Sequence, residues 1–150
     1  MEMGEAAREV HSSVTVKLPR DEAFRLFTEG IGSWWPMVTH SVYEAEALHV
    51  ILEPRVGGRL YESTADERTS DWGTVTIWQP VERVAMTWHP GYGKELATLV
   101  EVRFSETPDG GTVVDLRHTG WEVHGAETEQ KAIGYEAGWA IVLNHLARVA

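Results

Sequence analysis

The stretch LRHTGW, residues 116–121, holds the polar side chain best placed to do chemistry in this chain. It ends a predicted strand in which Asp115 and Arg117 must point to solvent, so His118 lies on the opposite, apolar face. An imidazole with a pKa near its ordinary value of about 6.5 can act as an acid or a base, or hydrogen-bond a ligand oxygen. An inward histidine can equally be a structural residue whose ring nitrogens are satisfied in the core. The sequence leaves both readings open.

Acid–base catalysis by His118 would need a second group within hydrogen-bond reach. Glu53, His89 and Tyr135 are the candidates, and nothing in their spacing brings any of them close. We expect no metal site, because the chain has no cysteine and its seven histidines show no HxH or HxxxH spacing. We expect no cofactor either, since neither a phosphate-binding glycine loop nor a nucleophile-elbow serine occurs.

Aromatic residues are the second group that could form a binding site, since seven of the 150 residues are tryptophan. Trp34 and Trp35 are adjacent in GSWWPM, so they cannot face the same way. Trp35 lies four residues after Ile31, which favours the inward direction for Trp35 and a rim or lid position for Trp34. The other large aromatics could line a pocket or simply fill a core: Trp72, Trp88, Trp121, Tyr135 and Trp139.

The elements that must position these side chains follow from the apolar periodicity. A strand over 10–18 precedes a helix over 19–29, and GSWWP forms a second short helix or turn that Pro36 ends. Short alternating segments then predict strands, in the ranges 47–53, 59–64, 72–80, 82–89, 97–106 and 111–121. Residues 126–150 return to helical spacing. Consecutive short strands imply antiparallel pairs, and the long helix must cover the apolar face of the sheet.

Within these elements the inward faces can be named. Val84, Met86 and Trp88 share one face of their strand, and Val102 belongs to the inner set of the next one. The segment 72–80 is ambiguous, because apolar residues occupy both of its faces. Gly138 in the last helix costs about 1 kcal/mol relative to alanine, and we expect close backbone packing there. Arg55 in EPRVGG could bind a ligand carboxylate, or pair with a nearby glutamate in a structural hairpin.

Composition sets further limits. A formal charge of −10 disfavours nucleic-acid binding and anionic membranes. No apolar run is long enough to span a bilayer, and the N-terminal residues lack the apolar core of a signal peptide. The length of 150 residues predicts a single domain over 1–150. The absence of cysteine and of a signal-peptide pattern favours the cytoplasm. We also expect no membrane insertion.

Several stretches together resemble the START-like (SRPBCC) superfamily, in the branch of small proteins similar to the activator of the heat-shock-protein-ninety ATPase. They are VKLPRDEAFRLFTE, GSWWP, EPRVGGRLYE, WGTVTIWQPVERVAMTWH, LRHTGW and YEAGWAIVLNHLARVA, in this order. The resemblance implies an α+β helix-grip fold, a curved antiparallel sheet of six to seven strands around a long C-terminal helix, with two short helices after the first strand. It also implies a cavity between sheet and helix. The true cochaperone has an additional chaperone-binding domain that these residues do not contain, so we expect no chaperone binding.

The leading hypothesis is a protein that binds a small apolar, aromatic or lipid-like ligand in that cavity, and the sequence favours a binding protein over an enzyme without deciding whether turnover occurs. The residues predicted to line it are Trp34, Trp35, Trp88, Val102, His118, Trp121, Tyr135 and Trp139. The first alternative is a metal-free lyase of the polyketide cyclase or dehydratase kind, with His118 as acid–base. The second is an interaction module, cochaperone-like or a homodimer, using exposed aromatics such as Trp78.

Overall fold

The computed structural model describes residues 8–150. Residues 1–7, which begin the segment where we expect no signal peptide, lie outside the described range. The strands are β1 (Val10–Val16), β2 (Ala47–Leu52), β3 (Arg59–Thr64), β4 (Thr69–Gln79), β5 (Arg83–Trp88), β6 (Thr98–Glu106) and β7 (Thr112–Thr119). The helices are α1 (Arg20–Phe27) and α2 (Thr128–Val149), with short 3-10 turns at η1 (Ile31–Ser33), η2 (Glu44–Glu46), η3 (Lys94–Leu96) and η4 (Trp121–Glu127).

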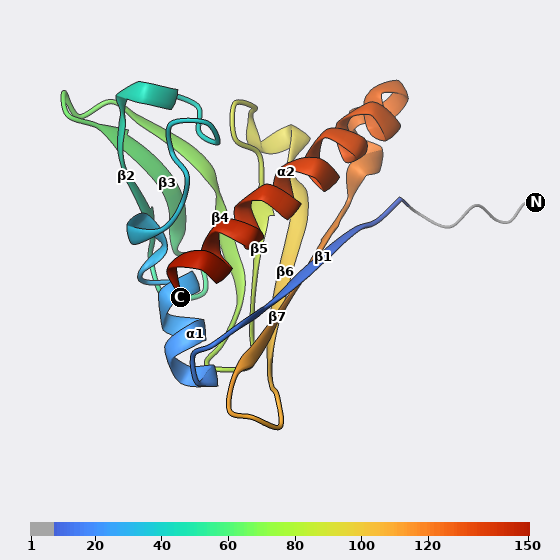
Figure 1. The fold of residues 1–150 in the computed structure, drawn as a ribbon. Coiled ribbons are helices and arrows are strands. Elements are labelled where there is room, and N and C mark those ends of the chain that lie inside the picture. Colours follow the sequence, from blue (N-terminus) through green and yellow to red (C-terminus); the bar gives the residue numbers. More distant parts are fainter. Residues whose placement is uncertain (1–7) are drawn as a thin grey trace, which may run out of the picture.

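The seven strands form one antiparallel sheet in the order β1-β7-β6-β5-β4-β3-β2. The sheet curves, and α2 runs obliquely across its concave side from the β1 edge toward α1 (Figure 1). The predicted α+β helix-grip fold is therefore confirmed. The second predicted short helix is only the 3-10 turn η1, because Pro36 follows it too closely for a longer helix.

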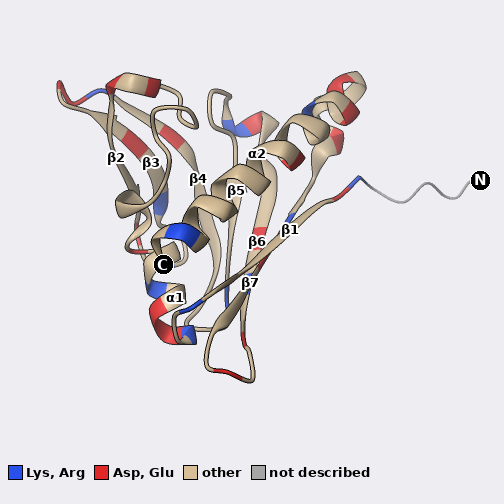
Figure 2. Ribbon diagram, in the orientation of Figure 1, with Lys and Arg blue, Asp and Glu red and all other residues tan. Residues whose placement is uncertain are grey.

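The strict alternation of β5, β6 and β7 places their predicted inner residues in the core. Val84, Met86, Val102 and Leu116 are all buried on the concave side. The middle of α2 matches this apolar surface, because it carries no Asp, Glu, Lys or Arg between Glu136 and Arg148 (Figure 2). Burial of this sheet face against α2 therefore contributes hydrophobic stabilisation.

Two register shifts explain why apolar residues occupy both predicted faces of the segment that forms β4. One lies in its pairing with β3 and the other in its pairing with β5. Each inserts an extra residue, so Trp72, Val75 and Trp78 can all turn inward although they are three apart. At the first shift a Cβ on Gly73 would lie 1.8 Å from the Thr87 carbonyl oxygen, so only glycine permits this close approach of the strands.

Candidate functional site

A cavity of about 440 Å³ lies between the concave sheet face and α2 and is partly open to solvent. Its lining comes from the segment after η1, from β4 and β5, from the turn after β5, and from α2. The lining residues are Trp35, Thr39, His40, Ser41, Val42, Trp72, Trp88, Pro90, Gly91, Tyr135, Gly138, Trp139 and Val142. None of these carries a formal charge at neutral pH, which suits a neutral ligand.

Trp88 lies at the centre of the aromatic part of this lining. Its ring centroid is 5.0 Å from that of Trp139, 5.6 Å from that of Trp72 and 6.1 Å from that of Trp35. Tilted and edge-to-face contacts at such distances are the favoured geometry for aromatic pairs. Four predicted lining residues, Trp35, Trp88, Tyr135 and Trp139, therefore lie together at the cavity.

Gly138 does not mark the close packing of the helix backbone that the sequence predicts there. Apart from its chain neighbours and the backbone of its own helix, a Cβ at this position would meet no atom within 4 Å, so no packed neighbour requires glycine there. Gly138 instead lines the cavity, next to Trp139. The expectation of tight packing is wrong, and the missing side chain leaves room in the cavity.

His118 is inward, as the strand pattern predicts, but it lies behind the cavity wall. It is fully buried, and both ring nitrogens have partners. Trp139 Nε1–H donates to Nδ1 at 2.9 Å, so Nδ1 is an acceptor and the proton is on Nε2. Nε2 lies 2.6 Å from Thr98 Oγ1, which in turn donates to the Trp88 carbonyl at 3.0 Å.

This environment keeps the imidazole neutral. Burial, and to a smaller extent the nearby His124, lowers the pKa of His118 to about 3. A ring with both nitrogens occupied and no solvent-exposed surface is not available to exchange protons with a bound molecule. The hypothesis of His118 as acid–base is therefore wrong for this structure. His118 positions the cavity residue Trp139 through its hydrogen bond.

Three other predicted ligand-binding residues belong to the core and do not line the cavity. Trp34 is 2% exposed, packs 5.4 Å from the Phe27 ring and donates to the Leu26 carbonyl at 2.9 Å, so its predicted rim position is wrong. Val102 lies in the core of the sheet, and Trp121 donates to the His118 carbonyl. For Val102, strand parity predicted the inward direction correctly but not whether the side chain reaches the cavity.

The cavity wall formed by residues 39–42 was missed at the sequence level. Ser41 Oγ donates to the Met37 carbonyl and accepts from the Glu44 N–H. His40 lines the cavity, its carbonyl accepts from Trp35 Nε1 at 2.7 Å, and partial burial lowers the pKa of its ring. This polar segment has neither helical nor strand periodicity, so only its position after GSWWP could have pointed to it.

A buried carboxylate holds this wall in place. Glu62 on β3 is fully buried and accepts from the Val42 N–H at 2.7 Å, the Tyr43 N–H at 3.0 Å and Trp72 Nε1 at 2.6 Å. It therefore links the 39–42 wall to the Trp72 side of the same cavity. Three donors to a buried carboxylate compensate its desolvation.

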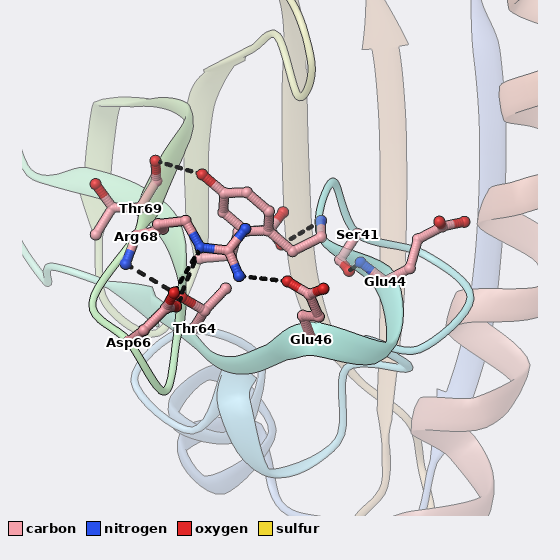
Figure 3. A network of polar contacts seen from close by, with 9 residues as sticks. Ser41, Glu44, Glu46, Thr64, Asp66, Arg68 and Thr69 are labelled. Carbon is pink, nitrogen blue, oxygen red and sulfur yellow. Dashed lines mark hydrogen bonds and ion pairs between the residues drawn. The ribbon is translucent and has the colours of Figure 1, made fainter.

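An exposed network reinforces the attachment at the edge of the sheet (Figure 3). Arg68 bridges Glu46 and Asp66, and the Tyr43 hydroxyl donates to the Thr69 carbonyl at 3.0 Å. Exposed ion pairs contribute about 0–1 kcal/mol each. The buried Glu62 is thus the stronger anchor.

Of the remaining residues considered for a functional role, only Tyr135 lines the cavity. Arg55 is exposed, pairs with Glu53 at 3.3 Å and does not line the cavity. Trp78, expected in an exposed patch, is partly buried and packs edge-to-face on Phe24 at 5.2 Å, so that expectation is wrong. Glu53 and His89 do not line the cavity, whereas Tyr135 does.

Among residues 8–150 no group of three histidine or acidic side chains is arranged to hold a metal ion. In the same range no helix is long and apolar enough to cross a membrane.

Comparison with known proteins gives the family. A family model described as Activator of Hsp90 ATPase homolog 1-like protein matches residues 17–150. The chain belongs to this family. The membership expected from the resemblance is therefore confirmed, within the START-like (SRPBCC) fold. A search of curated proteins returned no significant match.

Solved structures of similar proteins include one relative of higher identity and several that share only the fold. The anthrahydroquino-γ-pyrone synthase Txn09, in complex with SUM, is 32% identical over 85% of this chain and 86% of its own, with a TM-score of 0.58. Protein MLL2253 from Mesorhizobium loti is 19% identical, with coverages of 94% and 95% and a TM-score of 0.66. The Aha1 dimer from Colwellia psychrerythraea is 16% identical, with both coverages at 93% and a TM-score of 0.64.

Proposed function

We propose that this protein binds a neutral aromatic or lipid-like small molecule in the cavity between the sheet and α2. The single observation that carries the proposal is the uncharged lining of a cavity of about 440 Å³, with aromatic rings from the sheet on one side and from α2 on the other. Cavities of this size and character are typical of small-molecule sites. A flat ring system could stack on Trp88 or Trp139, with polar contacts from the 39–42 wall.

The test is a binding screen by native mass spectrometry and thermal shift, with neutral polycyclic aromatics, sterols and fatty acids as probes. We expect a 1:1 complex with at least one neutral aromatic and a rise in the melting temperature that grows with ligand concentration. A screen in which no apolar or aromatic probe binds would contradict the proposal.

A second candidate is an enzyme of the cyclase kind, which the 32% identity with the synthase Txn09 favours. His118 cannot serve as its acid–base, so the candidates are the two titratable side chains that line the cavity, His40 and Tyr135. Burial raises the pKa of Tyr135, which keeps the phenol protonated and able to donate. Turnover of a polyketide-like substrate that His40→Asn abolishes, without loss of binding, would support this candidate over simple binding.

A further inference from the structure

The indole N–H groups of the buried tryptophans divide into two kinds. Five have protein acceptors: Trp34 donates to Leu26 O, Trp35 to His40 O, Trp72 to Glu62, Trp121 to His118 O and Trp139 to His118 Nδ1. Trp88 Nε1 is the one buried side-chain polar atom of residues 8–150 that lacks a hydrogen-bond partner there. An unsatisfied buried donor costs about 1–3 kcal/mol, so such a group calls for an explanation.

The location of the Trp88 indole N–H explains why it has no protein acceptor. Trp88 is 5% exposed, and it lines the cavity together with Tyr135. Its N–H is close enough to the Tyr135 hydroxyl to oppose the rise that burial causes in the pKa of Tyr135, but the two groups do not meet in hydrogen-bond geometry. The described hydrogen bonds give the Tyr135 hydroxyl no protein partner either. An indole N–H and a phenol O–H therefore converge at one part of an uncharged wall.

We propose that Trp88 Nε1–H and the Tyr135 hydroxyl form a subsite that binds an acceptor oxygen, such as a carbonyl, of a neutral aromatic ligand. This inference rests on the proposed binding function and narrows its ligand class. Two donors at one point recognise an oxygen with two lone pairs, whereas a pure hydrocarbon would leave the Trp88 donor unpaired in the complex. The absence of charged groups from the lining favours a ketone or quinone oxygen over a carboxylate.

The experiment uses two probes with the same tricyclic skeleton, 9-fluorenone, which carries a carbonyl, and fluorene, which carries a methylene there. We expect wild-type protein to bind fluorenone about five- to tenfold more tightly than fluorene, in keeping with one or two added hydrogen bonds. Trp88→Phe keeps a ring but removes the N–H and leaves only the Tyr135 hydroxyl, so it should reduce this preference to about two- to threefold and leave fluorene binding within about twofold. Trp78→Phe, outside the cavity, is the matched control and should keep the preference.

Tyr135→Phe gives a second variant in case Trp88→Phe does not fold, and it should reduce the fluorenone preference. Equal binding of the two probes to wild-type protein, or a preference that neither substitution reduces, would overturn the subsite while leaving cavity binding intact. If neither probe binds wild-type protein, whereas apolar probes of other shapes do, the aromatic-ketone class is wrong. If no probe of any kind binds, the proposed function itself fails, and the subsite with it.

Discussion

The substitution Gly138→Leu should make the protein more stable and weaken its binding of the ligand roughly a hundredfold. Gly138 lies within α2, faces the cavity and has no atom within 4 Å of where a Cβ would be. Replacing a mid-helix glycine by leucine gains about 0.5–1 kcal/mol of helix propensity. For a chain of this length that corresponds to a rise of about 1–4 °C in the melting temperature.

Binding should change in the opposite direction. The four carbons of leucine would occupy space that a ligand would otherwise fill, and each excluded methylene costs about 0.8 kcal/mol of buried apolar contact. The sum is about 3 kcal/mol, or roughly a hundredfold loss of affinity. Thermal melts and fluorescence titrations with the probe from the screen measure the two effects.

Gly134→Leu is the matched control for this prediction. Gly134 lies one helical turn away in α2, is equally unobstructed and does not line the cavity. It should give a similar rise in melting temperature with unchanged affinity. If Gly138→Leu lowers stability, the space beside Gly138 is not open. If it binds the probe as tightly as Gly134→Leu does, the ligand does not occupy this cavity, and the reasoning is refuted.

Two further predictions concern the residues behind the cavity wall. Glu62→Gln should lower the free energy of unfolding by about 1–3 kcal/mol in urea titrations, because the new amide NH2 would face N–H groups that now donate to the carboxylate. The exposed Glu44→Gln is the control and should have little effect. His118 is neutral in the folded protein down to about pH 3, whereas the unfolded chain protonates near pH 6.5, so stability is lost as the pH falls through this window. The protonation of His118 in the unfolded chain should lower the free energy of unfolding by about 1.6 kcal/mol between pH 6.5 and pH 5. His118→Gln should flatten this dependence on pH, whereas the exposed His49→Gln should not. An unchanged pH dependence in His118→Gln would contradict the burial of a neutral ring.

The fold could be predicted where the side chains alternate without interruption. The strict alternation around Val84, Val102 and Leu116 placed three strands and their inner faces correctly, and the spacing of Trp139, Val142 and Leu146 did the same for α2. In β4 the alternation failed, because two bulges turn residues three apart to the same side. Bulges depend on the pairing with neighbouring strands, which a single-strand pattern does not contain.

The candidate site was predictable only in part, for a related reason. Parity says that both Trp88 and His118 point inward, but whether an inward side chain reaches the cavity or the packed core depends on what lies above it on α2. Trp139 covers His118 through a hydrogen bond and leaves Trp88 beside the open space at Gly138. The 39–42 wall shows neither helical nor strand periodicity in its sequence. It is held by Glu62, which is twenty residues away in the sequence from Val42, so the local pattern could not predict its position.

The most direct test of ligand binding in this cavity is the set of tryptophan indole N–H signals in a ¹⁵N-correlated NMR titration with a bound aromatic probe. Seven signals are expected. Binding in the cavity should give large shifts for the cavity indoles of Trp35, Trp72, Trp88 and Trp139, and little change for Trp78, which packs on Phe24 and does not line the cavity. Large shifts at Trp78 with unmoved Trp88 and Trp139 signals would place the ligand elsewhere and contradict the account.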